Sequence, residues 1–116
     1  MRFGKLRFGS ITIDGRLYTC DVIIDRGEVR KRKKKPSKKF RPQFDHTPVS
    51  IQEKLPWKCR RLIIGTGNYG SLPVMDEVKH EARGRKVELI IAPTDEAIET
   101  FCNDPKDTNA ILHVTC

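Results

Sequence analysis

The sequence lacks the features that mark membrane, metal-binding and secreted proteins. No apolar stretch approaches the roughly 20 residues that a membrane-spanning helix needs. Strand-like residues begin by Ile11 and leave no room for a secretory hydrophobic region, so we expect a cytoplasmic protein with reduced thiols. No C-x-x-C pair is present, which argues against a metal site and a dithiol redox motif; the scattered cysteines are Cys20, Cys59, Cys102 and Cys116.

Acidic residues are absent between Arg30 and Arg41, a segment that holds nine basic residues. Without these nine, the chain has 14 basic residues against 15 acidic ones, so this segment carries the whole excess of the +8 net charge. Such a run is typical of a solvated hairpin end and loop. It also fits a nuclear address or a docking site for an acidic partner or a phosphate backbone, with candidate residues Lys33, Lys34, Lys35, Lys38 and Lys39.

The chain length limits the architecture to one domain over residues 1–116. A chain of 116 residues buries roughly two thirds of the surface that its unfolded form exposes, which is enough for one core. Hydrophobic residues make up 37% and charged residues 33%, as in an ordinary globular protein with a hydrated surface. We expect the basic segment 30–41 to be a loop attached to this nearly neutral domain.

The first half of the chain shows the period of antiparallel strands. Ser10 to Ile13 is followed by an Asp-Gly turn signal and by an alternating run from Leu17 to Ile24, which together predict a β-hairpin. A second tight turn predicts an edge strand from Val29 to about Lys33, whose lysines discourage edge-to-edge pairing. Prolines and charge predict a loop from Lys34 to Thr47.

The second half changes to helical spacing. The capping pattern from Ser50 to Glu53 predicts a short helix that Pro56 ends. Further on, the pattern predicts strand, helix, strand, helix and strand, the two helices over residues 72–83 and from Thr94 onward, and the strands over 61–64, 87–92 and 110–115. A mixed α/β sheet with a right-handed crossover accommodates this β-α-β-α-β order, with the N-terminal hairpin beside or across it.

A glycine loop follows the first strand of this half, at the spacing G-x-G-x-x-G from Gly65 to Gly70. Glycine tolerates positive φ, so such a loop can bring backbone N–H groups close to an anion or to another main chain. A dinucleotide site would need an acidic residue after the next strand, where the sequence has Ala92-Pro93 instead. A contact with another anion or small molecule, and a purely structural connection, are the remaining interpretations.

Two residues near the C-terminus invite a catalytic interpretation, because a histidine can activate a thiolate. On a strand, however, His113 and Cys116 face opposite sides. We therefore expect His113 to orient the glycine loop or to line a cleft at the strand ends. An enzyme that uses His113 with a nearby carboxylate such as Asp95 is a further alternative, although the sequence shows no paired acid and base.

Four blocks of the sequence stand out in chain order, namely His46-Thr47-Pro48-Val49, Leu62 to Gly67 with Leu72 and Val74, Thr94 to Ala97, and Leu112 to Cys116. Together they resemble the Mth-nine-three-eight-like domain family, a domain of unknown function found in the adipogenesis-associated domain protein and in mitochondrial complex I assembly factor three. The resemblance implies a compact three-layer α/β domain with a mixed central sheet, and a role in assembly or regulation without an established catalytic activity.

These observations favour a non-enzymatic domain, without a cofactor, metal or membrane partner, that binds a protein partner or small anion. The expected cleft is bounded by Gly65, Thr66, Gly67, Asn68 and His113, because ligands of open α/β sheets sit at the carboxyl ends of strands. Nucleic-acid binding through segment 30–41 is the alternative. The sequence leaves the ligand, the physiological partner and the choice between a monomer and a small homo-oligomer open.

Overall fold

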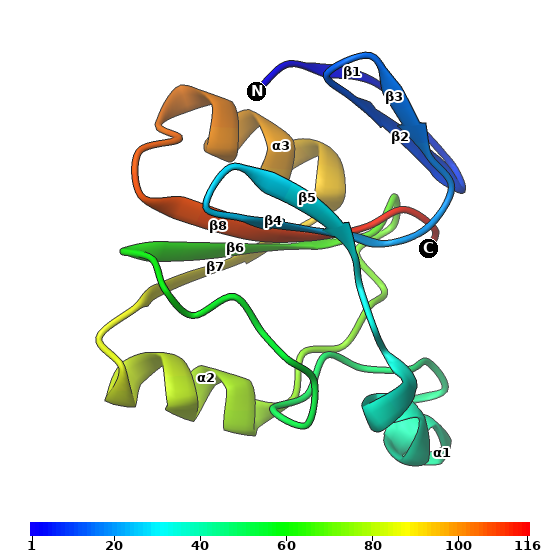
Figure 1. Cartoon of the computed structure of the whole chain (residues 1–116). Coiled ribbons are helices and arrows are strands. Elements are labelled where there is room, and N and C mark those ends of the chain that lie inside the picture. The colour runs from blue at the N-terminus through cyan, green and yellow to red at the C-terminus, as the bar shows by residue number, and fades with distance from the viewer.

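The computed structural model describes all 116 residues, from Met1 to Cys116, as two β-sheets with helices packed around them (Figure 1). One sheet has the order β1-β2-β3 and is antiparallel, and the other has the order β5-β4-β8-β6-β7 and is mixed. The strands are β1 (Phe3–Arg7), β2 (Ser10–Ile13), β3 (Arg16–Tyr18), β4 (Val22–Asp25), β5 (Glu28–Lys31), β6 (Arg61–Thr66), β7 (Glu88–Ala92) and β8 (Thr108–His113). The helices are the 3-10 helix η1 (Lys35–Phe40), α1 (Arg41–Phe44), α2 (Asp76–Gly84) and α3 (Thr94–Asn103).

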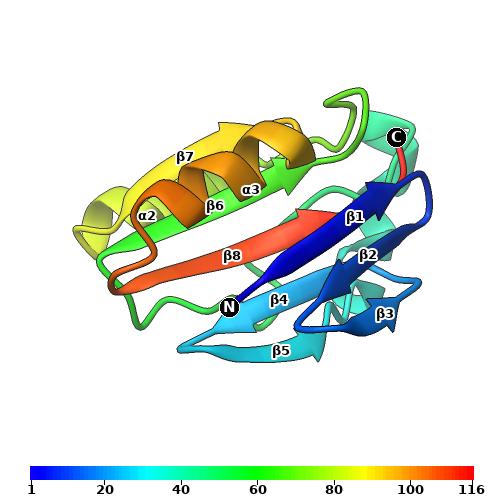
Figure 2. The same cartoon turned by 90° about the horizontal axis from the view of Figure 1, so that it is seen from above.

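The five-stranded sheet separates two hydrophobic clusters, which gives the domain three layers. Helix α3 and the three-stranded sheet cover one face, and α2 lies on the other (Figures 1 and 2). Alternate residues of the central strands serve opposite clusters: Ile63 joins the cluster that includes α3, while Leu62 and Ile64 join the one that includes α2. All residues of β6 and β8 are buried, so both strands are central.

The predicted β-α-β-α-β half is confirmed. β6, β7 and β8 are parallel to one another, and α2 and α3 form the crossovers. Helix α2 begins at Asp76, later than the predicted residue 72, and β8 spans 108–113 where 110–115 was expected. No helix of the chain combines the length and apolar character needed to cross a membrane.

The expected strand from Leu17 to Ile24 is wrong, because the chain breaks into β3 and β4 and these belong to different sheets. The break includes Asp21, a buried carboxylate with partners on other elements. The hairpin is the pair β2-β3, joined at Asp14-Gly15 as predicted. Strand β1 was not predicted; it completes this sheet by pairing with β2.

Two further expectations fail between β5 and β6. The predicted helix after Ser50 is absent, although its capping contacts form: the Gln52 amide donates to Ser50 Oγ over 3.2 Å, and the Ser50 amide donates to Glu53 Oε2 over 3.3 Å. The segment 30–41, expected as a loop, comprises the end of β5, a short connection, the helix η1 and the first residue of α1. Edge strand β5 itself was predicted and is confirmed.

The glycine loop provides a stability test, because Gly67 combines a φ of +100° with crowding. A Cβ there would lie 2.5 Å from the carbonyl carbon of Cys116. We expect Gly67→Ala to lower the free energy of unfolding by about 3 kcal/mol, measured by chemical denaturation. Gly9→Ala is the control, because its φ is +89° but no atom lies within 4 Å, so only backbone strain of about 1 kcal/mol is expected. Equal losses in the two variants would show that the contact with Cys116 has no energetic weight.

Candidate functional site

Thr94, at the start of α3, joins the glycine loop to the end of β8. The Gly67 amide donates to Thr94 Oγ1 over 2.8 Å, and the Thr94 hydroxyl donates to the His113 carbonyl over 2.6 Å. The Thr94 amide in turn donates to the Gly67 carbonyl over 3.1 Å. Gly65 is required beneath this junction, because a Cβ there would lie 2.9 Å from Thr94 Oγ1. The hydroxyl predicted to cap α3 therefore acts as a bridge between two strand ends.

The residues after β8 occupy the backbone donors of the glycine loop. The Asn68 amide donates to the Thr115 carbonyl over 2.7 Å, and the Ser71 amide donates to the Cys116 carbonyl over 2.9 Å. Of the amides from Gly67 to Leu72, only that of Tyr69 makes no hydrogen bond within the chain. The structure thus brings the loop and His113 to one rim of the sheet, with Thr66 opposite His113 in register, but leaves almost no loop amide free to hold an anion.

A chain of buried polar groups begins at His113 and leads away from the glycine loop. His113 Nδ1 lies 2.8 Å from Asp21 Oδ2, and the Val114 amide donates to Asp21 Oδ1 over 3.1 Å. On its other side Asp21 accepts from the Arg32 guanidinium over 3.0 Å. A second carboxylate, Glu53, receives two further bonds from Arg32, each of 2.8 Å. The network therefore joins the ends of β8, β4 and β5 to the turn at Glu53.

Burial and pairing act in opposite directions on the ionisation of this network. Burial alone would raise the pKa of Asp21, but the hydrogen bond and charge of His113, the charge of Arg32 and the Val114 amide together hold it below its ordinary value. Burial would likewise lower the pKa of Arg32, yet Glu53 and Asp21 hold it above its ordinary value. Both groups are therefore charged at neutral pH and compensate each other inside the domain.

The same network anchors the basic segment. Arg32 is only 3% exposed and also donates to the Pro48 carbonyl over 3.0 Å. On η1, the buried Ser37 hydroxyl donates to Glu53 Oε2 over 2.6 Å and lies 2.7 Å from Ser50 Oγ. Sequence reasoning missed this anchor because Arg32 stands in a run of exposed cations. The capping pattern of Ser50 and Glu53 was the available signal, and it was interpreted as the start of a helix.

A small hollow opens beside the network, with a volume of about 200 Å³. At its wall Cys116 Sγ lies 4.0 Å from His46 Nδ1, and Thr115 Oγ1 lies 3.0 Å from His113 Nε2. No Asp or Glu side chain lines the hollow, and neither Lys34 nor Arg41 forms an ion pair. The lining residues are Arg32, Lys34, Arg41, His46, Thr47, Leu72, His113, Thr115 and Cys116.

The predicted site residues divide between different places. His113 and Lys34 line the small hollow, whereas Gly65, Thr66, Gly67 and Asn68 form the adjacent strand end and loop without lining it. Lys33 lines a larger hollow under β5. The remaining predicted cations are exposed on η1, namely Lys35, Lys38 and Lys39. Asp95 is exposed on the first turn of α3, where its carboxylate accepts from the Glu96 amide, and it does not reach the hollow.

The fold and this rim define a small mixed α/β domain with a polar network at the carboxyl ends of its parallel strands. Residues 3–103 match a family described as "Protein of unknown function (DUF498/DUF598)". The chain belongs to this family, in agreement with the resemblance to the Mth-nine-three-eight-like domains seen in the sequence.

Solved structures support the assignment. The conserved hypothetical protein PH1505 from Pyrococcus horikoshii OT3 is 27% identical, with a TM-score of 0.82 and coverage of 100% of both chains. The structure titled MT938 is also 27% identical, with a TM-score of 0.73 and coverage of 98% of this chain and 97% of the other. XCC1710 from Xanthomonas campestris, 14% identical with a TM-score of 0.69 and coverage of 97% and 83%, shares the fold. No curated protein matches the chain.

The network makes a prediction about acid stability. Because the pKa of Asp21 is lowered in the folded protein, its ionisation stabilises the fold above the unfolded carboxyl pKa of about 3.9. That contribution is lost as the pH falls below this value and through the folded pKa. We expect Asp21→Asn to cost about 3 kcal/mol at pH 7, because it removes one partner of a buried ion pair, and the difference from wild type to shrink below pH 4.

Denaturation midpoints measured from pH 7 to pH 2 check this expectation. Asp76→Asn is the matched control, because the Asp76 side chain is 81% exposed and its surface pair with Lys79 contributes less than about 1 kcal/mol. A loss that is equally large in Asp21→Asn at pH 7 and at pH 2 would contradict the proposed role of the ionised carboxylate.

Proposed function

We propose that the protein is a non-enzymatic binding domain, which holds a small anion or an anionic group of a protein partner in the hollow beside the glycine loop. The observation that carries this proposal is the charge of the side chains in the wall: two unpaired cations and two imidazoles, with no Asp or Glu side chain among the lining residues. Unpaired cations that converge on a concave surface attract anions and raise their local concentration.

The anchored basic segment delivers the charges to this hollow. Lys34 lies two residues after Arg32 in the chain, and Arg41 is the first residue of α1. Arg32 itself is held by Glu53 and Asp21, so it positions the segment and is not free to form a bidentate contact with a ligand. The hydroxyl group of Thr47 supplies a neutral donor on the same wall.

The volume of the hollow favours a compact ligand. About 200 Å³ is below the range of roughly 300 to 1,000 Å³ typical of sites for drug-sized molecules. A phosphate, a sulfate or a terminal carboxylate fits this scale, and the group can belong to a free ion or to a partner. The dimensions and the cations thus point to the same class of ligand.

A catalytic role has less support from the geometry. His113 Nδ1 is occupied by Asp21 and its Nε2 by Thr115, so a proton transfer to a ligand would have to break one of these contacts. The contact between Cys116 Sγ and His46 Nδ1, at 4.0 Å, is longer than the hydrogen-bond distance expected for an activated nucleophile. These contacts favour positioning and binding over chemistry.

Titration with inorganic phosphate, sulfate and citrate at constant ionic strength tests the proposal. We expect at least one anion to raise the melting temperature, because a ligand at 100 times its dissociation constant adds about 2.7 kcal/mol. The double variant Lys34→Gln/Arg41→Gln should weaken the binding of that anion at least about tenfold, since two charge-assisted contacts are removed.

Lys106→Gln is the control, because it removes an exposed cation that does not line the hollow. Calorimetry on all three proteins gives the dissociation constants. If no anion binds, or if the control loses as much affinity as the double variant, the hollow is not an anion site.

A further inference from the structure

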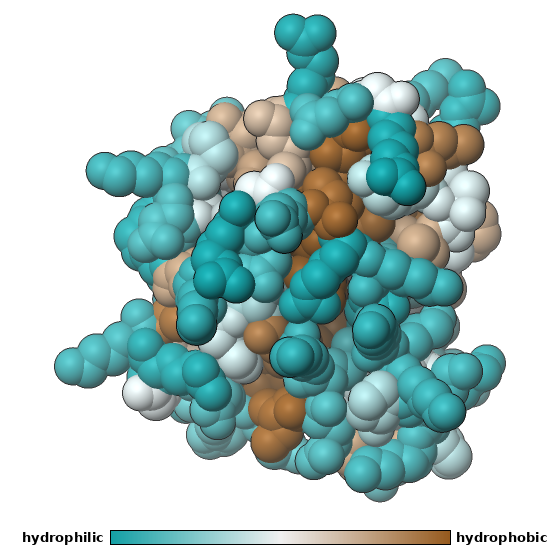
Figure 3. All heavy atoms as spheres, in the orientation of Figure 1, coloured by the Kyte–Doolittle hydropathy of each residue, from teal (hydrophilic) through white to brown (hydrophobic).

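Strand β5 forms one edge of the five-stranded sheet, and no other element continues the sheet beyond it (Figure 2). Apart from its ladder with β4, the main chain of Glu28 to Lys31 makes no hydrogen bond. The space-filling view in the orientation of Figure 1, with β5 toward the viewer, shows an apolar strip there between hydrophilic side chains (Figure 3). The edge is therefore open to another strand.

The turn before β5 determines which backbone groups face outward. Arg26 and Gly27 have φ values of +50° and +83°, as in a two-residue hairpin turn closed by the pair Asp25 and Glu28. At the far end the Arg32 amide donates to the Asp21 carbonyl over 2.9 Å. Bonded pairs alternate in an antiparallel ladder, so Glu28, Arg30 and Arg32 bond inward toward β4. The backbone groups at the alternate positions, 29 and 31, are directed away from the sheet.

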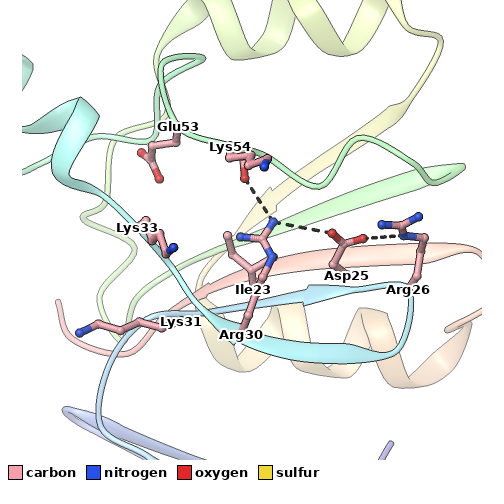
Figure 4. Close-up of a pocket in the computed structure, with 8 residues that line it drawn as sticks. All are labelled: Ile23, Asp25, Arg26, Arg30, Lys31, Lys33, Glu53 and Lys54. Carbon is pink, nitrogen blue, oxygen red and sulfur yellow. Dashed lines mark hydrogen bonds and ion pairs between the residues drawn. The ribbon is translucent and has the colours of Figure 1, made fainter.

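A cationic hollow of about 480 Å³ lies along this edge, with Ile23 among its lining residues (Figure 4). Its two carboxylates are already paired. Asp25 lies 3.0 Å from the Arg26 guanidinium and 3.7 Å from that of Arg30, while Glu53 is held by Arg32. The cations without an ion-pair partner are Lys31, Lys33 and Lys54.

We propose that this edge binds an extended acidic segment of a partner protein, which adds a sixth strand beside β5. The outward backbone groups at positions 29 and 31 supply ladder hydrogen bonds, as in other cases of strand addition. Because the side chains of a strand alternate between its two faces, the Asp or Glu side chains that face the hollow meet its unpaired lysines, and the apolar side chains lie on the opposite face of the sheet, where Val29 packs. The ladder supplies affinity, and the lysines select an acidic sequence.

The same charges disfavour the other occupants of an open edge. A second copy of the chain would place Arg30, Lys31 and Lys33 against their own counterparts, and lysines on an edge strand oppose such pairing. A nucleic acid can contact the lysines but has no peptide backbone to continue the ladder. The added strand lies outside the small hollow of Lys34 and Arg41, so this proposal and the proposed anion site can fail independently.

Nuclear magnetic resonance titration with an eight-residue peptide of alternating Glu and Val tests the proposal. We expect the amide signals of Val29 and Lys31 to shift and to become protected from hydrogen exchange. A Lys and Val peptide of the same pattern should not bind. The variant Lys33→Gln/Lys54→Gln should weaken the binding of the acidic peptide at least about tenfold, while Lys34→Gln/Arg41→Gln leaves it within about twofold.

A backbone variant separates strand addition from simple charge attraction. Lys31→Pro removes both the charge and the outward N–H but leaves the ladder with β4 intact, whereas Lys31→Gln removes the charge alone. Lys31→Pro should bind the peptide at least about tenfold more weakly than Lys31→Gln, with the fold checked by circular dichroism. If Lys31→Pro does not fold, the exchange protection of Val29 and Lys31 in wild type decides.

Three results would overturn the proposal. The first is equal affinity of Lys31→Pro and Lys31→Gln, or absence of protection at the β5 amides. The second is binding of a single-stranded oligonucleotide that displaces the peptide and that is weakened in both double variants, Lys33→Gln/Lys54→Gln and Lys34→Gln/Arg41→Gln. That result would indicate a general surface for polyanions. The third is concentration-dependent self-association that shifts the same amides without any peptide.

Discussion

The ion pairs of Arg32 are the constraint on which the rest of this structure depends. A buried guanidinium is costly unless its charge and its donors are satisfied, and here Glu53, Asp21 and the Pro48 carbonyl satisfy them together. These partners belong to separate parts of the chain. Arg32 follows β5, Asp21 precedes β4, and Glu53 lies in the turn before β6. These three segments must therefore come together before the charge of Arg32 can be buried.

Because Arg32 is held in place, the neighbouring lysines of the basic segment have defined positions on the surface. Free in solution, such a run of like charges would repel itself and remain extended. Because Arg32 is fixed at its centre, the cations on either side of it are presented at different places: Lys33 at the hollow under β5 and Lys34 at the small hollow near His113. One basic segment thus contributes lysines to two separate hollows.

Thr94 plays the corresponding part at the glycine loop. Its single hydroxyl accepts from Gly67 and donates to the His113 carbonyl, so it closes the loop against the last strand. The glycines there permit a close approach of backbone to backbone, as Gly67 and Cys116 show. In this protein the G-x-G-x-x-G spacing is consistent with close packing of the loop against the C-terminal residues. A ligand would therefore be held by the side chains of the adjacent hollow and not by the amides of the glycine loop.

Local periodicity was sufficient to predict part of this fold. The apolar spacing of β6, α2, β7, α3 and β8 predicted their order and the mixed sheet, because each buries one face or both. His113 was predicted near the glycine loop because both lie at the carboxyl ends of adjacent strands. Asp21, Arg32 and Glu53 could not be predicted as a site, because their positions are far apart in the chain and only tertiary pairing brings them together. From Leu17 to Ile24, the alternation of apolar residues continues through Asp21 and so predicted one strand. The chain nevertheless leaves the strand before Asp21, whose buried carboxylate bonds to other elements.

The position of β8 has a consequence for how the domain assembles. This strand comes after all the others in the chain, yet it lies between β4 and β6 and is bonded to both. Until residues 108–113 are in place, the N-terminal hairpins and the β6-β7 unit have no shared strand to join them. Completion of the sheet therefore depends on contacts between distant parts of the chain, a topology that slows folding relative to helical domains of the same size.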